Sequence, residues 1–182
     1  TGIDPIYYDI ITCENCWYTT LREYWDRGMA TEHYFMRTMH KFKSEPGLRY
    51  NLNKWKYDIN DVFLAYYFTL FCVNECFNRG RSLIFAKIWL RISWLYASCG
   101  DKEMEMYASN QSRDCFLQAF SESLMDDGRN SQPLLIIAGV VCNKVGDRKN
   151  AKFFLTQAVM TRGGAEKWKE QAKALTDKFK LR

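Results

Sequence analysis

The chain has 182 residues and a net charge of +5, and 47% of its residues are hydrophobic and 16% aromatic. This composition excludes a disordered protein and indicates a globular domain with a sizeable core. The longest uncharged apolar run, residues 133–142, is about half as long as the roughly 20 residues that a membrane span needs, so no membrane association is expected. The first residues lack the basic flank and apolar core of a secretory signal.

Two features of the composition bear on location and partners. Seven cysteines, an odd number spread along the chain, do not suggest a disulfide framework, so we expect a reducing, cytoplasmic location. Residues 144–182 carry 11 basic and 4 acidic side chains, a local balance of +7. Such an excess is typical of a solvated helix surface, and a nucleic-acid surface is the alternative.

Turn signals divide the N-terminal part into short blocks. Residues 6–12 are rich in β-formers and predict an extended segment, residues 19–26 and 31–43 predict two short helices, and residues 48–57 predict a loop. Asp58 or Asn60 can then begin a long helix that ends near Gly80.

The remaining chain predicts a series of helices. Residues 82–99 form a helix that is apolar nearly all round, which is typical of a helix lying between neighbours. Residues 102–126 predict a more polar helix, and residues 165–179 predict an amphipathic last helix.

Residues 134–158, between these two, predict a pair of short helices hinged at Gly146 and Asp147. Small residues stand where the two helices would cross closely; they are Ala138, Gly139, Ala151 and Ala158. This pattern is typical of a tetratricopeptide-type hairpin, which buries its apolar face only by stacking on neighbours.

An earlier segment, IWLRISWLYASCGD, is similar to LLIIAGVVCNKVGD when their Gly-Asp turns are superposed 46 residues apart. Trp89 then falls on Leu135, and Ser93 on Gly139. We interpret the two segments as one well-formed and one degenerate repeat. Chance similarity between two amphipathic hairpins is the alternative.

Cys13 and Cys16 form a C-x-x-C motif, which lets two thiolates converge on one metal, whereas tetrahedral zinc needs a second pair of ligands. Cys72 and Cys76 share one helix face and could complete a four-sulfur site only if that helix folds over the motif. The alternative is that these cysteines are small core residues.

Lys87, Arg91 and Trp94 line one face of the helix at residues 82–99, and Asn143 and Lys144 extend this candidate partner-binding surface. Two cations beside an indole would suit a peptide carboxylate or an acidic side chain. The alternative is a buried Trp94 with a structural ion pair at Arg91. No nucleophile, base or phosphate-binding loop stands in a catalytic pattern, so we expect a protein that is not an enzyme.

Residues 4–19, 86–105 and 134–158 together resemble a bacterial family of uncharacterised proteins, a domain of unknown function. The resemblance implies a zinc-ribbon-like, cysteine-rich start followed by a tetratricopeptide-like helical body. It also implies that Cys13 and Cys16 are half of a zinc site whose other cysteine pair precedes them in the family. Glu14 and Trp17 replace the family's proline and glycine, so we expect no cofactor in this chain and zinc only in a longer one.

The predicted fold class is all-α, with antiparallel helix pairs in a tetratricopeptide-like array after a short extended N-terminal segment. We expect a single domain over residues 1–182: an extended segment with the C-x-x-C motif at 1–18, N-terminal helices at 19–80 and the repeat half at 81–182. The predicted function is a non-enzymatic scaffold that binds a protein or peptide partner. The alternative is a nucleic-acid-associated or regulatory protein that uses the basic C-terminal helices with a zinc knuckle.

Overall fold

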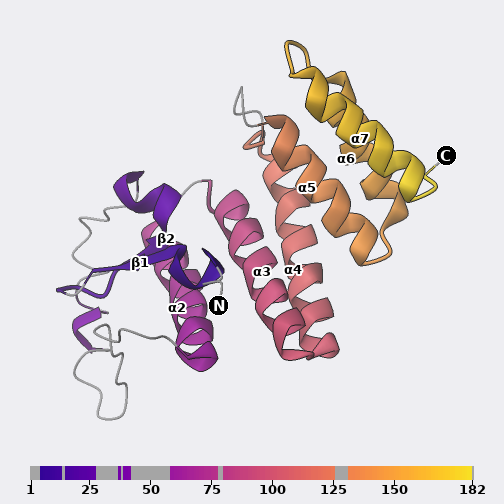
Figure 1. Cartoon of the computed structure of the whole chain (residues 1–182). Helices are drawn as coiled ribbons and strands as arrows, with labels where there is room; N and C mark the ends of the chain where they lie inside the picture. The colour runs from indigo at the N-terminus through magenta and orange to yellow at the C-terminus, as the bar shows by residue number, and fades with distance from the viewer. Residues whose placement is uncertain are drawn as a thin grey trace. The chain divides into compact units, whose positions relative to one another are not determined.

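The computed structural model describes residues 5–13, 15–27, 37, 39–41, 58–77, 80–125 and 131–181. The chain divides into two compact units, Thr1–Ile84 and Phe85–Arg182, each described by itself (Figure 1). The organisation as a single domain, with inner boundaries at residues 18 and 80, stays a prediction.

The first unit begins with a small antiparallel hairpin. Strand β1 (Ile10–Thr12) pairs with β2 (Thr19–Leu21), and 3-10 helices η1 (Pro5–Tyr8) and η2 (Arg22–Arg27) flank the pair. The predicted helix at residues 19–26 is therefore wrong for its first three residues. Two consecutive threonines favour a strand, and Thr19 Oγ1 donates to Thr12 Oγ1 across the hairpin at 3.1 Å.

Helix α2 (Ile59–Cys76) packs against this hairpin. Its start follows from a capping box, in which Asp58 Oδ1 accepts from the Asp61 amide at 2.9 Å and Asp61 Oδ2 accepts from the Asp58 amide at 3.2 Å. The prediction of a helix start at Asp58 is confirmed. The predicted helix at residues 31–43 is described only at residues 37 and 39–41, which are helical, and the predicted loop at 48–57 lies outside the described residues.

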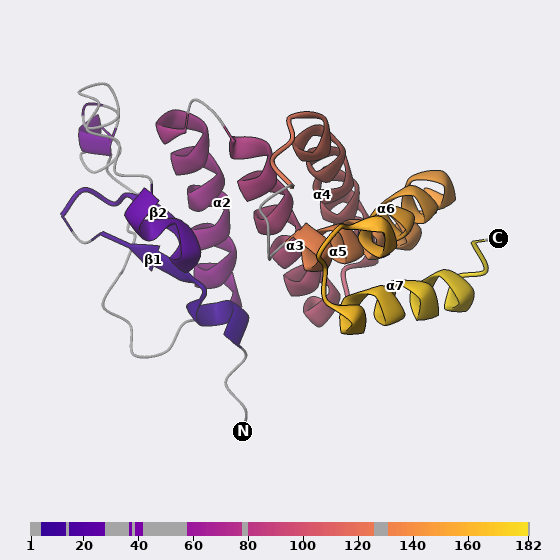
Figure 2. The same ribbon diagram turned by 90° about the horizontal axis from the view of Figure 1, so that it is seen from above.

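The second unit is built from helices, which confirms the predicted fold class. They are α3 (Arg81–Cys99), which begins four residues before the unit, α4 (Lys102–Ser121), α5 (Ser131–Lys144), α6 (Arg148–Met160) and α7 (Glu166–Lys178). Seen from above, α4 and α6 lie on one side, and α3, α5 and α7 lie on the other (Figure 2). Helix α4 ends five residues earlier than predicted, because Ser123 adopts a left-handed φ of 58° that no α-helix continues.

The two Gly-Asp turns have the same hydrogen bonds, as their superposition predicts. At the first, the Asp101 amide donates to the Tyr96 carbonyl at 3.1 Å, and at the second the Asp147 amide donates to the Cys142 carbonyl at 2.9 Å. Both turn glycines have a left-handed φ, 76° at Gly100 and 81° at Gly146, which glycine adopts without steric cost. The hairpins α3–α4 and α5–α6 are therefore closed in the same way.

Close packing between α5 and α6 depends on Gly139. A Cβ at this position would lie 2.8 Å from Leu155 Cγ and 3.3 Å from the Ala151 carbonyl oxygen. Ala138, Ala151 and Ala158 are all fully buried in the same hairpin. The predicted small residues therefore stand where the two helices approach each other.

Candidate functional site

The C-x-x-C motif lies in a tight turn between the strands of the first unit. The Cys13 amide donates to the Tyr18 carbonyl, and the Trp17 amide donates to the Cys13 carbonyl, both at 2.8 Å. Because Thr12 pairs with Thr19 in the hairpin, these bonds hold both cysteines within one closed loop.

Trp17 has the left-handed backbone that this turn requires, with φ of 60°. The resemblance places glycine here, and a residue with a Cβ costs roughly 1–2 kcal/mol in this conformation. The indole packs against the buried core formed by Tyr18, Met39 and Cys72. Partial burial of the large ring against this core helps to offset the backbone cost.

Helix α2 does fold over the turn, which was the condition for a four-sulfur site. Cys72 is fully buried and its thiol donates to the Trp17 carbonyl at 4.0 Å. The other residues packed on the same core are Cys13, Cys16, Trp17, Trp25, Phe68, Phe71 and Cys76. Within the ranges that the structure describes, however, no three His, Cys, Asp or Glu side chains are grouped so that they could hold a metal ion.

Burial in this core keeps the Cys72 thiol protonated at neutral pH. Burial raises the pKa of Cys72 to about 12, and burial also raises the pKa of Tyr18 well above its usual value. Because the thiolate is the nucleophile and the metal ligand, a buried protonated thiol is inert at neutral pH. Zinc binding by Cys13 and Cys16 stays a prediction.

The second candidate surface lies on α3. Lys87, Arg91 and Trp94 follow one another at spacings of four and three on a continuous helix, so they share one face. Trp94 is 51% exposed, which excludes the alternative of a buried indole. Arg91 Nη1 donates to the Lys87 carbonyl at 3.2 Å, which orients its guanidinium along this face.

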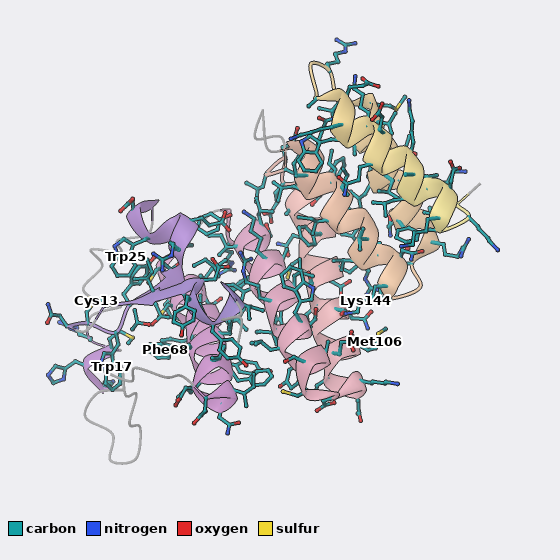
Figure 3. All side chains as sticks on the ribbon, viewed as in Figure 1. Cys13, Trp17, Trp25, Phe68, Met106 and Lys144 are labelled. Carbon is teal, nitrogen blue, oxygen red and sulfur yellow. The ribbon has the colours of Figure 1, made fainter. Side chains whose placement is uncertain are left out.

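Asn143 and Lys144 lie at the end of α5, and among the described residues no hydrogen bond or ion pair joins them to Lys87, Arg91 or Trp94. Lys144 Nζ forms an ion pair of 2.5 Å with Glu105 Oε1 of α4, and the Asn143 carbonyl accepts from the turn amide of Gly146 at 3.1 Å. Figure 3 places Lys144 beside Met106, near the start of α4. Lys144 therefore connects the two hairpins.

Sequence reasoning missed two exposed apolar residues, Ile137 and Val140, which are 38% and 37% exposed on α5. The 46-residue superposition of the hairpins places them at the positions of Arg91 and Trp94. The repeat therefore indicated that Ile137 and Val140 are equivalent to two candidate site residues. The superposition alone, however, does not show which face of each helix is exposed.

Part of the basic C-terminal charge contributes to the fold. Arg148 Nη2 donates to the carbonyls of Phe179 at 3.1 Å and of Lys180 at 2.7 Å, and so ties the start of α6 to the end of α7. Lys169 pairs with Glu166 at 3.6 Å on the surface of α7. These contacts account for two of the cations that a nucleic-acid surface would use.

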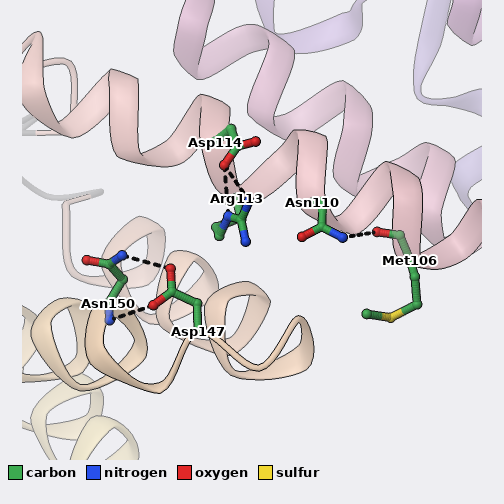
Figure 4. Close-up of polar contacts among 6 residues, drawn as sticks. All are labelled: Met106, Asn110, Arg113, Asp114, Asp147 and Asn150. Atoms are coloured by element: carbon green, nitrogen blue, oxygen red, sulfur yellow. Dashed lines mark hydrogen bonds and ion pairs between the residues drawn. The ribbon is translucent and has the colours of Figure 1, made fainter.

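Helices α4 and α6 carry further local polar contacts. Asp147 caps α6 by accepting from the Asn150 amide at 3.1 Å and from its side-chain nitrogen at 2.7 Å (Figure 4). Arg113 Nη2 pairs with the neighbouring Asp114 at 2.7 Å, and Asn110 Nδ2 donates to the Met106 carbonyl at 2.9 Å. All of these contacts are between near neighbours in sequence, so they stabilise helices and form no site.

Comparison with known proteins gives a family for the chain. The model of a family described as an uncharacterised protein conserved in bacteria (DUF2225) matches residues 1–179. No curated protein and no solved structure gives a significant match. None of the described helices is long and apolar enough to cross a membrane.

Proposed function

Because the chain belongs to this uncharacterised bacterial family, we propose a function from its surface: a non-enzymatic scaffold that binds a protein or peptide partner. The partner would contact the face of α3 that carries Lys87, Arg91 and Trp94. The observation that carries the proposal is the half-exposed indole of Trp94 beside two cations on one helix face. Trp and Arg are among the residue types that most often dominate binding energy at protein interfaces.

The helical body is the scaffold in this proposal. Two hairpins closed by equivalent Gly-Asp turns support a tetratricopeptide-like array, in which each unit packs on its neighbour and leaves one face of its first helix exposed. Asn143 and Lys144 belong to the edge of this surface, where Lys144 joins α5 to α4. All seven cysteines are free thiols, which supports a reducing, cytoplasmic location.

The second candidate function is nucleic-acid association through the basic helices α6 and α7. The excess of positive charge over residues 144–182 supports it. The use of Arg148 and Lys169 in contacts within the fold favours the scaffold.

Site-specific photo-crosslinking tests the proposal. A photoreactive phenylalanine replaces Trp94 in the protein produced in bacterial cells, and the matched control replaces Met160, which is 68% exposed on α6. We expect one discrete adduct at position 94, none at 160, and loss of the adduct in Arg91→Glu. Equal crosslinking at both positions would contradict the scaffold. Retention of nucleic acid that falls steeply as salt rises would favour the second function.

A further inference from the structure

Cys13 and Cys16 lie within a single turn of the chain between β1 and β2. The bond from the Trp17 amide to the Cys13 carbonyl closes this turn, and the left-handed φ of 60° at Trp17 is typical of the residue that ends one. Residues three positions apart on a helical turn have Cβ atoms about 5–6 Å apart. A disulfide needs them about 4 Å apart, so an adjustment of about 1–2 Å within the turn is enough to form one.

Exposure separates these two thiols from most of the other cysteines. Neither Cys13 nor Cys16 is in a disulfide, and both are half-buried, whereas Cys72 and Cys142 are buried. Cys99 is exposed, but the cysteine nearest to it in sequence is 16 positions away on another helix. Cysteines that sense oxidants are accessible to solvent and often lie beside a second thiol that resolves the first product. The turn of Cys13 and Cys16 combines both properties.

We propose that Cys13 and Cys16 are a redox-active dithiol, which peroxides oxidise to a disulfide and which dithiol reductants restore. This inference is independent of the scaffold function. Disulfides that form inside a reducing compartment are usually transient ones with a catalytic or sensing role.

The reaction with hydrogen peroxide takes two steps. One thiolate attacks a peroxide oxygen, the O–O bond breaks, the sulfur becomes a sulfenic acid, and the leaving oxygen takes a proton to become water. The second thiolate then attacks the sulfenic sulfur, an S–S bond forms, the S–O bond breaks, and a second water leaves. Two thiols therefore give two electrons and two protons to one peroxide. In the reverse direction, an external dithiol gives two electrons back.

Helix α2 supplies the competing thiols, Cys72 and Cys76. The Cys72 thiol is fully buried and donates to the Trp17 carbonyl at 4.0 Å, so it contacts the turn from inside the core. A bond from the turn to Cys72 would require the hairpin and α2 to move relative to each other. A bond between Cys72 and Cys76 would distort a continuous helix. The pair within the turn needs neither change, so we expect it to form first.

The test uses the full chain, reduced, kept in EDTA and then treated with hydrogen peroxide. Trypsin cleaves after Arg22, so one peptide, residues 1–22, carries Cys13 and Cys16 and no other cysteine. In mass spectrometry we expect this peptide to become lighter by two hydrogen atoms and to resist alkylation, and dithiothreitol should restore both thiols. It should react at least tenfold faster than the peptide of residues 57–79, which carries Cys72 and Cys76.

Serine variants identify the two roles. Cys16→Ser removes the second thiol, so Cys13 should accumulate as a sulfenic acid that dimedone traps, and Cys13→Ser makes the same test of Cys16. The matched control Cys99→Ser changes an exposed thiol and should leave the oxidation of residues 1–22 unchanged. Circular dichroism shows whether each variant is folded, and the parent chain decides the proposal if one is not.

Three results would overturn the proposal. A crosslink between the peptides of residues 1–22 and 57–79 would assign the disulfide to the turn and α2 together. Faster oxidation of residues 57–79 would assign it to α2 alone. If residues 1–22 gain oxygen without losing two hydrogen atoms, at the rate of the single thiol Cys99, then Cys13 and Cys16 do not act as a pair.

Discussion

Gln132 Nε2 donates a hydrogen bond of 2.9 Å to the Ala158 carbonyl inside the α5–α6 hairpin, and Gln132 is only 3% exposed. Ala158 lies in the last turn of α6, where carbonyls lack the amide of a following helical turn. The side chain of one helix therefore supplies the missing partner at the end of the other.

The first prediction follows from this bond. Gln132→Leu keeps the size of the side chain but leaves a buried carbonyl without its donor, so we expect a loss of about 1–3 kcal/mol in the free energy of unfolding. Urea denaturation followed by circular dichroism measures it. The control is Gln118→Leu on the exposed face of α4, which should change stability by less than about 0.5 kcal/mol. Equal losses in both variants would contradict the role of the buried bond.

The second prediction concerns the contact of Gly139 with Leu155. Gly139→Ala should destabilise the protein by about 1–3 kcal/mol, because the added Cβ would lie 2.8 Å from a buried Leu155 Cγ. In a Leu155→Ala background the same change should stabilise it by up to about 1 kcal/mol, since alanine is the better helix former. A double-mutant cycle by chemical denaturation measures this reversal. The same sign in both backgrounds would show that the contact does not limit the packing.

The third prediction concerns alkaline pH. Burial, followed by the charge of Asp147, raises the pKa of Cys142 from 9.0 to about 12. The native state therefore retains this proton while the unfolded state loses it above pH 9. Stability is fully present below that pH and falls as pH rises toward 12, by up to about 1.4 kcal/mol per pH unit for one such group. Urea unfolding at pH 8 and pH 10.5 measures the loss.

A pair of cysteine variants isolates this contribution. Cys142→Ala should lose less stability between the two pH values than the parent chain does, whereas Cys99→Ala, which changes an exposed thiol, should lose as much as the parent. A slope in Cys142→Ala equal to that of the parent would assign the pH dependence to other groups, such as Cys72 and Tyr18.

The fourth prediction concerns metal removal. We expect EDTA to leave the helical signal and the melting temperature unchanged, because the core of the second unit consists of apolar residues of α3–α7. Zinc analysis of the same sample shows whether any ion was removed. Loss of cooperative unfolding after chelation would mean that a metal holds the fold together.

The sequence predicted the helices of the second unit because turn glycines, caps and apolar periodicity agree there. The repeat extends further than its motif showed. Ser112 Oγ donates to the Ala86 carbonyl at 2.8 Å in the first hairpin. Ser112 lies 46 positions before Ala158, and Ala86 lies 46 positions before Gln132, so this bond is the counterpart of the bond from Gln132 to Ala158. The direction of donation is reversed between the two pairs, so no residue-by-residue similarity could show it. The strand at residues 19–21 was missed because three residues are too few for a period.

The candidate site was predicted in part. Spacing on a helix was enough to place Lys87, Arg91 and Trp94 on one face. The ion pair between Lys144 and Glu105 could not be predicted, because it joins residues 39 positions apart on different hairpins. The packing of Trp17 on Cys72 likewise depends on how α2 folds back over the turn.

The hydrogen bond from the Tyr66 hydroxyl to the Ile6 carbonyl, 2.8 Å long, joins residues 60 positions apart, whereas both cross-helix bonds in the hairpins join residues 26 apart. The first unit must therefore close a much longer loop before its contacts form. Local contacts favour rapid folding, and loop closure delays distant ones. We expect the helical hairpins to fold first and the strand–helix unit to follow in a slower phase, so that newly unfolded chains recover α5–α6 before they bury the cysteine turn.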